Sequence, residues 1–267
     1  MALLAPERHD RILARLRTRT TATVQEISDE LEVTKETVRR DLDALERAGS
    51  LERIHGGAVL AGSGVRAETP WRERQSRRAE QKRAIATAAL DFLPPSSGSA
   101  LLDAGTTTEA LADLLADDAA VPPAAEGGIR AVITDAVPIA QTLADRPHLD
   151  LEVLGGQVRG ITGAVVGDQA LATLAARRVD VAFLGTNGLD AAFGLSTPDA
   201  AEAAVKAAMI RSARRSVLLA DATKHEVSSL VRVAELSALD VLITDAEPPA
   251  ALRAALDEAE VEVVIAR

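Results

Sequence analysis

The spacing of apolar residues in the first part of the chain predicts three short helices and a hairpin. Residues 7–17, 24–31 and about 35–48 each place leucine, isoleucine or valine at helical spacing on one face. Residues 51–60 instead alternate around the pair Gly56-Gly57, which is typical of two strands joined by a tight turn. Three helices followed by a hairpin predict a winged helix.

The ends of the second and third helices are marked by capping residues. Thr23 and Glu26 have the spacing of a capping box at the start of the second helix. Thr34 is suited to begin the third helix and Gly49 to end it. The tight turn between the two helices has helix-turn-helix spacing, in which the second helix of the pair enters the major groove of DNA.

The third helix has the side chains that such a role requires. An apolar stripe begins at Val38, and Thr37, Arg39 and Arg40 lie off that stripe. Arginine can donate two hydrogen bonds to guanine or bind a phosphate. The alternative is an ordinary solvated face, because Glu36 and Arg40 form an i,i+4 pair of opposite charges.

From residue 99 onward, apolar runs alternate with helical patterns. Strands are expected at Ala100–Leu102, Ala131–Ile133, Leu151–Leu154, Val181–Leu184, Val217–Leu219, Val241–Ile243 and Val261–Ile265. Helices are expected at about Glu109–Leu115, Pro138–Ala144, Asp168–Ala176, Asp199–Ser212 and Pro249–Ala259. This alternation predicts an α/β domain with a mostly parallel sheet, in which ligands bind beyond the carboxyl ends of the strands.

The segment Asp103-Ala-Gly-Thr-Thr follows the first of these strands and opens a helix. A glycine turn, free helix-terminal amides and two threonine hydroxyls suit an anion, and phosphate in particular. The alternative is an ordinary strand-to-helix turn with threonine caps. Gly155-Gly156, residues 185–188 and residues 221–224 follow other strands, so four such turns are expected on one rim.

Composition favours two parts with separate functions. The chain has 267 residues and a net charge of −10, but residues 84–267 alone carry 13 Lys/Arg against 26 Asp/Glu. There is no cysteine, which excludes disulfides and thiolate metal sites, and the four histidines are not clustered in the sequence. Residues 1–10 become charged too early for a signal peptide, and no apolar run approaches about 18 residues. We therefore expect a cytoplasmic protein without cofactor or metal.

Three segments, ERHDRILARL, TVRRDLDALERAG and LERIHGGAVL, together resemble the DNA-binding domain of the DeoR family of bacterial transcription regulators. The resemblance implies that the third helix faces DNA and that the hairpin, the wing, lies near phosphates. The expected DNA-binding residues are Thr34, Lys35, Thr37, Arg39, Arg40, Arg53 and His55. Asp41 is expected to orient an arginine, since phosphate repels a carboxylate.

The later segments LLDAGTT, LGGQVRG, FLGTNGLD, GLSTPDAAEAAVKAAM and LLADATKHE resemble the DeoR-family sensor domain, which is related in fold to ribose-5-phosphate isomerase and binds phosphorylated sugars. The resemblance implies a phosphate site at Asp103, Gly105, Thr106 and Thr107 with Lys224 opposite, and a sugar near Gly185, Asn187, Thr197, Asp199 and Glu202. Asp135 stands where most family members have asparagine, so the resemblance assigns it no ligand role. The expected domains are residues 1–60 and 77–267, joined by a linker at 61–76.

The expected function is a transcription repressor of a sugar uptake or catabolism operon, released from its DNA operator by a phosphorylated sugar. Family habit suggests fructose 1-phosphate, and helix-turn-helix proteins usually bind DNA as dimers or larger oligomers. One alternative is an isomerase-like enzyme with a DNA-binding appendage and Glu202 as base. The isomerase's lysine-bearing glycine-rich segment, however, appears here as Phe193-Gly194-Leu195, without the lysine. A purely structural DNA-binding protein would leave the Asp103–Thr107 loop without a purpose.

Overall fold

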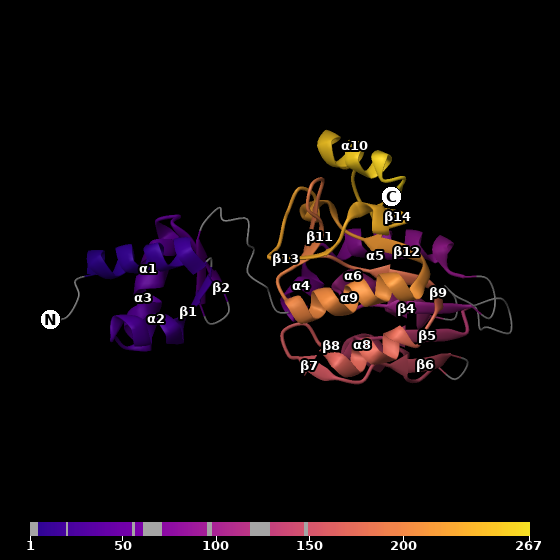
Figure 1. The fold of residues 1–267 in the computed structure, drawn as a ribbon, viewed down its shortest axis with the longest axis horizontal. Coiled ribbons are helices and arrows are strands. Elements are labelled where there is room, and N and C mark those ends of the chain that lie inside the picture. Colours follow the sequence, from indigo (N-terminus) through magenta and orange to yellow (C-terminus); the bar gives the residue numbers. More distant parts are fainter. Residues whose placement is uncertain are drawn as a thin grey trace. The chain divides into compact units, whose positions relative to one another are not determined.

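The computed structural model describes residues 5–19, 21–54, 57–60, 71–94, 98–117, 129–146 and 149–267. The chain divides into two compact units, Met1–Thr69 and Pro70–Arg267, which are described separately (Figure 1). Most of the expected linker, residues 61–70, lies outside the described residues, as does most of the acidic, proline-rich loop at 117–128. Within the described ranges, no helix is both long and apolar enough to cross a bilayer.

The first unit is a winged helix, as predicted. Its elements are α1 (Ala5–Arg19), β1 (Thr21–Thr23), α2 (Val24–Leu31), α3 (Lys35–Arg47), β2 (Leu51–Ile54) and β3 (Gly57–Leu60). The strands form an antiparallel sheet in the order β1-β3-β2, and β1 is an addition to the predicted hairpin. Gly57 permits this pairing, because a Cβ at that position would lie 2.2 Å from the carbonyl oxygen of Ala22.

The capping residues set the orientation of the helix pair. Thr23 and Glu26 form the predicted capping box, with the Thr23 side chain accepting from the Glu26 amide and the Glu26 carboxylate accepting from the Thr23 amide. Thr34 accepts from the amide of Thr37 at 3.2 Å and begins α3. Val38 and the following apolar residues of the α3 stripe are buried against α1 and α2, which leaves the opposite face of α3 toward solvent.

The second unit is built on a seven-stranded parallel sheet with the order β15-β14-β12-β9-β4-β5-β6. Its strands are β4 (Ser99–Leu102), β5 (Ala131–Thr134), β6 (Asp150–Val153), β9 (Val179–Leu184), β12 (Ala213–Leu219), β14 (Val241–Thr244) and β15 (Glu262–Ile265). Its helices are α4 (Trp71–Ser76), α5 (Ala79–Ala89), α6 (Thr106–Leu115), α7 (Val137–Leu143), α8 (Asp168–Ala175), α9 (Ala200–Ser212) and α10 (Ala250–Glu258), with the 3-10 turns η1 (Leu90–Phe92), η3 (Ala222–Lys224) and η4 (Leu236–Ala238). The predicted strands and helices are therefore present.

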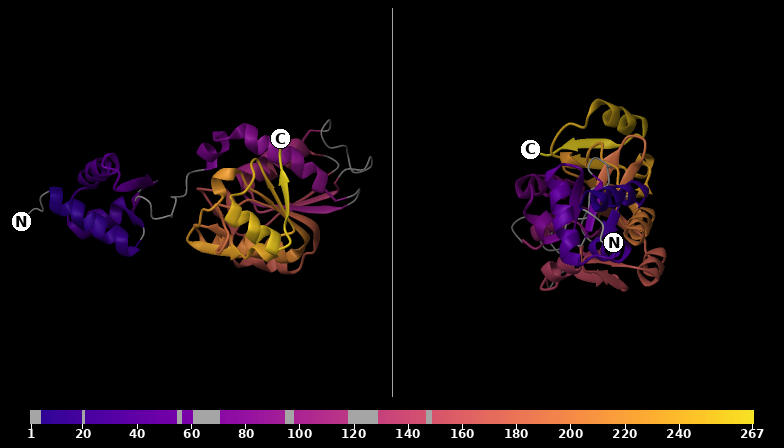
Figure 2. Two further views of the ribbon diagram at one scale, coloured as in Figure 1. Left: turned by 90° about the horizontal axis from the view of Figure 1, so that it is seen from above. Right: turned by 90° about the vertical axis from the view of Figure 1, so that its left-hand side faces the viewer.

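Helices cover both faces of this sheet (Figures 1 and 2). The reason is that successive strand residues point to opposite faces and both sets are apolar. Val181 and Phe183 of β9 pack in one core with α5, α6 and α7. Ala182 and Leu184 pack in the other core with α8, α9 and α10.

Two small antiparallel sheets were not predicted. One is the hairpin of β7 (Gln157–Arg159) and β8 (Ala164–Val166). The other joins β10 (Gly188–Asp190), β11 (Gly194–Thr197) and β13 (Val231–Ala234). Both lie in segments that follow parallel strands, so they stand beside the carboxyl-terminal edge of the main sheet.

Candidate functional site

The strand order creates a switch point between β4 and β9. From β4 the chain continues through β5 and β6 toward one edge of the sheet, whereas β9 and the later strands build outward on the other side of β4. The connections after β4 and β9 lead to α6 and α9, which pack on opposite faces of the sheet. Ligands of such folds bind at this switch point, beyond the carboxyl ends of β4 and β9, and we call the place the β4–β9 crevice. Asp103 follows β4 and Gly185 follows β9, and the amide of Asp103 donates to the carbonyl of Phe183 at 3.1 Å.

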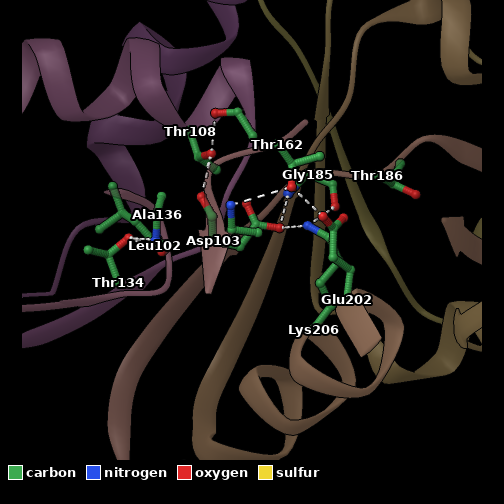
Figure 3. A network of polar contacts seen from close by, with 12 residues as sticks. Leu102, Asp103, Thr108, Thr134, Ala136, Thr162, Gly185, Thr186, Glu202 and Lys206 are labelled. Carbon is green, nitrogen blue, oxygen red and sulfur yellow. Dashed lines mark hydrogen bonds and ion pairs between the residues drawn. The ribbon is translucent and has the colours of Figure 1, made fainter. Parts of the chain in front are cut away.

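An ion pair between Asp103 and Lys206 lies at the centre of this crevice (Figure 3). Both side chains are buried, and Oδ2 of Asp103 also accepts from the amide of Gly185 at 2.8 Å. Nζ of Lys206 donates to the carbonyl of Gly185 at 3.2 Å. Burial alone would lower the pKa of Lys206, but the carboxylates of Asp103, Asp135 and Glu202 outweigh it and raise that pKa. The pair thereby fixes α9 to the ends of both central strands.

Helix α6 starts at the same crevice, at Thr106, three residues earlier than predicted. Gly105 is extended and its carbonyl accepts from the amide of Glu109 at 2.8 Å, which closes the first turn. The Thr108 hydroxyl stabilises the bend, since it lies 2.8 Å from the carbonyl oxygen of Asp103 and 2.7 Å from that of Gly105. The helix-terminal amides of residues 106–108 precede the first intrahelical bond, so they are suited to bind an anion. The side chain of Thr106 is half-buried and that of Thr107 is buried.

Two glycines, Gly105 and Gly185, lie beside Asp103 and leave its Oδ1 without a neighbouring side chain from either position. A Cβ on Gly105 would lie 3.5 Å from Oδ1 of Asp103, and a Cβ on Gly185 would lie 3.8 Å from it. This oxygen is buried and has no hydrogen-bond partner among the described residues. The same holds for Oδ1 of Asp135 and for the hydroxyl of Thr197, so polar atoms remain available for a bound molecule.

The carboxylate of Glu202 is already bound by neighbouring side chains. Its Oε1 accepts from the Thr162 hydroxyl at 2.5 Å and forms an ion pair with Arg159. Arg159 also lies 3.3 Å from Asp199, whose carboxylate caps α9 by accepting from the amides of residues 201 and 202. These contacts join the start of α9 to the β7–β8 hairpin.

The other predicted effector residues are placed around this network. The amide of Asn187 donates to the carbonyl of Ser196 at 3.1 Å, which links the β9 end to β11. Lys224 follows β12, two strands from β4 in the sheet order. Lys82 on α5 is affected by the charge of Lys224. Burial lowers the pKa of Lys82 to about 8, and the positive charge of Lys224 contributes to the decrease, whereas the negative charge of Asp221 opposes it. Lys224 is therefore close enough to Lys82 for its charge to be felt there.

The solvent face of α3 presents the predicted DNA-binding side chains of the first unit. Lys35, Arg39 and Arg40 are exposed and Thr37 is half-buried. Asp41 points the other way and binds Arg8 of α1 through two hydrogen bonds of 2.6 and 2.8 Å, which confirms that it orients an arginine. The side chain of Arg53 and the whole of His55 lie outside the described residues.

Lys206, Arg159 and Thr162 bind the carboxylates of Asp103 and Glu202 in the β4–β9 crevice, but none of the three was predicted. Glu202 and Lys206 stand four residues apart in an otherwise alanine-rich buried helix, and that spacing was a usable signal. Arg159 and Thr162 gave no comparable signal, because their partner Glu202 lies about 40 residues further along the chain.

Comparison with known proteins identifies the domain families that the chain matches. Residues 8–63 match the DeoR-like helix-turn-helix domain and residues 77–246 match the DeoR C terminal sensor domain. The chain is 31% identical to the HTH-type transcriptional repressor CsqR of Escherichia coli, over 97% of this chain and 94% of the relative. It is 29% identical to the glycerol-3-phosphate regulon repressor of the same organism, over 96% of this chain and 97% of the relative. A solved ribose 5-phosphate isomerase A from Neisseria gonorrhoeae is 16% identical, with a TM-score of 0.38 over 56% of this chain and 54% of that one.

Proposed function

Since the chain belongs to the DeoR family, we propose that it is a DNA-binding transcription repressor that leaves its operator when a phosphorylated sugar binds. The observation that carries this proposal is the crevice between β4 and β9, where a helix start suited to an anion adjoins buried polar atoms without partners. A relative named for the glycerol-3-phosphate regulon supports a phosphorylated effector and an operon of carbohydrate metabolism. A regulator of this kind acts on chromosomal DNA, which places it in the cytoplasm.

On the DNA side, α3 enters the major groove. Thr37, Arg39 and Arg40 read bases or phosphates, and Thr34 and Lys35 approach the backbone at the start of the helix. The wing residues Arg53 and His55 lie near neighbouring phosphates, as the family resemblance implies. Helix-turn-helix proteins bind repeated half-sites, so we expect two or more copies on one operator.

On the effector side, the phosphate binds at the start of α6. The amides of its first turn and the hydroxyls of Thr106 and Thr107 provide donors, and Gly105 allows close approach. Lys224 adds a positive charge from the β12 end. Asp103 was expected in the phosphate site, but we propose that it serves the sugar instead, because a phosphate dianion has no proton to donate to its carboxylate.

The remaining predicted residues surround the sugar. They are Gly185, Asn187, Thr197, Asp199 and Glu202. We propose that the site senses its ligand and does not catalyse a reaction, because the isomerase's lysine-bearing segment appears here as Phe193-Gly194-Leu195, and because Arg159 and Thr162 already bind Oε1 of Glu202. Relatives named as transcription regulators agree with this assignment.

The test uses the full chain and a DNA operator selected from a random pool. Fluorescence anisotropy measures operator affinity with and without a panel of sugar phosphates, including glycerol 3-phosphate and fructose 1-phosphate. Thr106→Val is expected to keep operator affinity and lose release, because it removes one phosphate contact, whereas Thr173→Val on α8 is the matched control and should respond like wild type. The proposal is wrong if no phosphorylated sugar changes operator affinity.

A further inference from the structure

The carboxyl group of Asp135 has no role in the phosphate site described above. It is 2% exposed, follows β5, and its Oδ1 has no hydrogen-bond partner among the described residues. Thr134 clamps this loop to β4: its hydroxyl donates to the carbonyl of Leu102 at 2.8 Å and accepts from the amide of Ala136 at 3.0 Å (Figure 3). The clamp holds Asp135 beside Asp103 at the ends of adjacent strands. A buried polar atom without a partner destabilises the fold, and a bound ligand that pairs with it removes that cost.

The charges around Asp135 leave it without a cation of its own. Lys206 forms its ion pair with Asp103, and Glu202 forms one with Arg159. Burial, and then the neighbouring charge of Asp103, raise the pKa of Asp135 well above its usual range, although Lys206 and a backbone hydrogen bond from Ala104 act in the opposite direction. A neutral carboxyl group can donate a hydrogen bond through its O–H.

Asp103 has the opposite hydrogen-bonding character. Its Oδ2 is taken by Lys206 and the amide of Gly185, so its carboxylate charge is compensated and Oδ1 remains an acceptor. That Oδ1 lies beside Gly105 and Gly185, neither of which has a side chain to cover it. An acceptor next to a donor suits the hydroxyl groups of a sugar, whereas a phosphate dianion has no proton to give to Asp103.

We propose that Asp135, buried and without a cation of its own, is a specificity-determining residue of the effector site, and that its carboxyl O–H donates from Oδ1 to an oxygen of the effector's carbon chain while Oδ1 of Asp103 accepts from a neighbouring hydroxyl. The effector class is then a phosphate ester with hydroxyl or carbonyl groups near the phosphate. Inorganic phosphate and simple alkyl phosphates satisfy neither oxygen. The inference rests on the proposed function, since it takes the phosphate to bind at the start of α6.

Calorimetry on the full chain tests this assignment with five probes: glycerol 3-phosphate, fructose 1-phosphate, fructose 6-phosphate, propyl phosphate and inorganic phosphate. Wild type should bind at least one of the three hydroxylated esters at least tenfold more tightly than propyl phosphate. Asp135→Ala should lose most of that preference, and Asp135→Asn should keep most of it because its amide still donates. Neither variant should change the affinity for propyl phosphate.

The pH dependence gives a second readout that needs only wild type and Asp135→Asn. We compare the affinity of wild type for the preferred ester with that of Asp135→Asn. The ratio of the two affinities should stay constant between pH 6 and 9 while Asp135 keeps its proton, and should fall where that proton is lost. Titration of the ester itself, and of Glu109, Lys82 and His225, affects both proteins and cancels in this ratio. Thermal unfolding of each variant shows whether the fold is kept.

Three results would overturn the assignment: a wild type without preference for hydroxylated esters, an Asp135→Ala variant that keeps the preference, or a ratio that rises with pH. Failure of the proposed function looks different. Thr106→Val should weaken all five probes, including inorganic phosphate, because it alters the phosphate contact alone. If it weakens none of them, the phosphate lies elsewhere, whatever Asp135 does.

Discussion

Single residues in the sensor unit show how much of its stability depends on paired charges. Lys206 and Asp103 are both buried, and removing one member of such a pair leaves an uncompensated charge that costs about 3–5 kcal/mol. We expect Lys206→Met to lower the free energy of unfolding by about that amount and Asp103→Asn in the same chain to restore part of it. Urea denaturation followed by fluorescence of Trp71, the single tryptophan, measures this. Strictly additive losses in the double variant would contradict the pairing.

Glu109 on α6 makes stability depend on pH. Burial, and then the charge of Asp113, raise its pKa from 4.5 to about 7, against the opposing charges of Arg74 and Lys82. Between pH 4.5 and 7 the folded chain therefore retains a proton that the unfolded chain has released, so rising pH destabilises the fold across that window. The penalty is complete above pH 7 and amounts to about 3 kcal/mol at most.

The corresponding variant is Glu109→Gln, which does not titrate. The stability of the variant minus that of wild type should increase as the pH is raised from 4.5 to 8. Thermal unfolding of both proteins at both pH values measures this increase. The fixed effect of the amide is the same at both values and drops out of the comparison. If the difference in stability between variant and wild type were the same at pH 4.5 and pH 8, Glu109 would ionise normally in the folded chain.

At the scale of elements, we propose that α3 determines DNA recognition. Arg39→Ala or Arg40→Ala should weaken binding to the selected operator by about 1–3 kcal/mol if that arginine reads a base. Alanine preserves the helix, so the loss reports the contact and not the fold. Arg47→Ala, in the last turn of the same helix, is the matched control, because base contacts come from the beginning of a recognition helix. Unchanged gel-shift affinity in both front variants would refute the assignment.

The helices and strands also show how much of the fold the sequence pattern predicts. The capped helices and the seven parallel strands follow from periodicity and capping residues, and all were predicted. The β7–β8 hairpin and the β10-β11-β13 sheet were not, because short strands such as Gln157–Arg159 and Gly188–Asp190 mix polar residues and glycine with few apolar ones, whereas most of the parallel strands are apolar runs. The pairing of Lys206 with Asp103 spans 103 residues, so only the folded sheet brings them together.

For the whole molecule, the division into two compact units agrees with a charge asymmetry that was visible in the sequence. The acidic C-terminal part repels DNA, so operator affinity has to come from the first unit and from the use of several copies. We expect light scattering of the operator complex to show a dimer or larger assembly. A complex with one copy per operator would contradict this expectation.

The two proposed sites belong to different compact units, so the effector can act on DNA only through a coupling free energy. An effector changes operator affinity only by its differential affinity for the free and DNA-bound protein. A coupling of about 1–3 kcal/mol would change operator affinity about 5- to 150-fold, and operator DNA must then weaken effector binding by the same factor. Anisotropy titrations with and without effector give one factor, and calorimetry with and without operator gives the other. Thr106→Val should abolish both together, since it removes the effector contact and leaves α3 untouched. Two factors that disagree would mean that release from DNA is not caused by the molecule bound in the β4–β9 crevice.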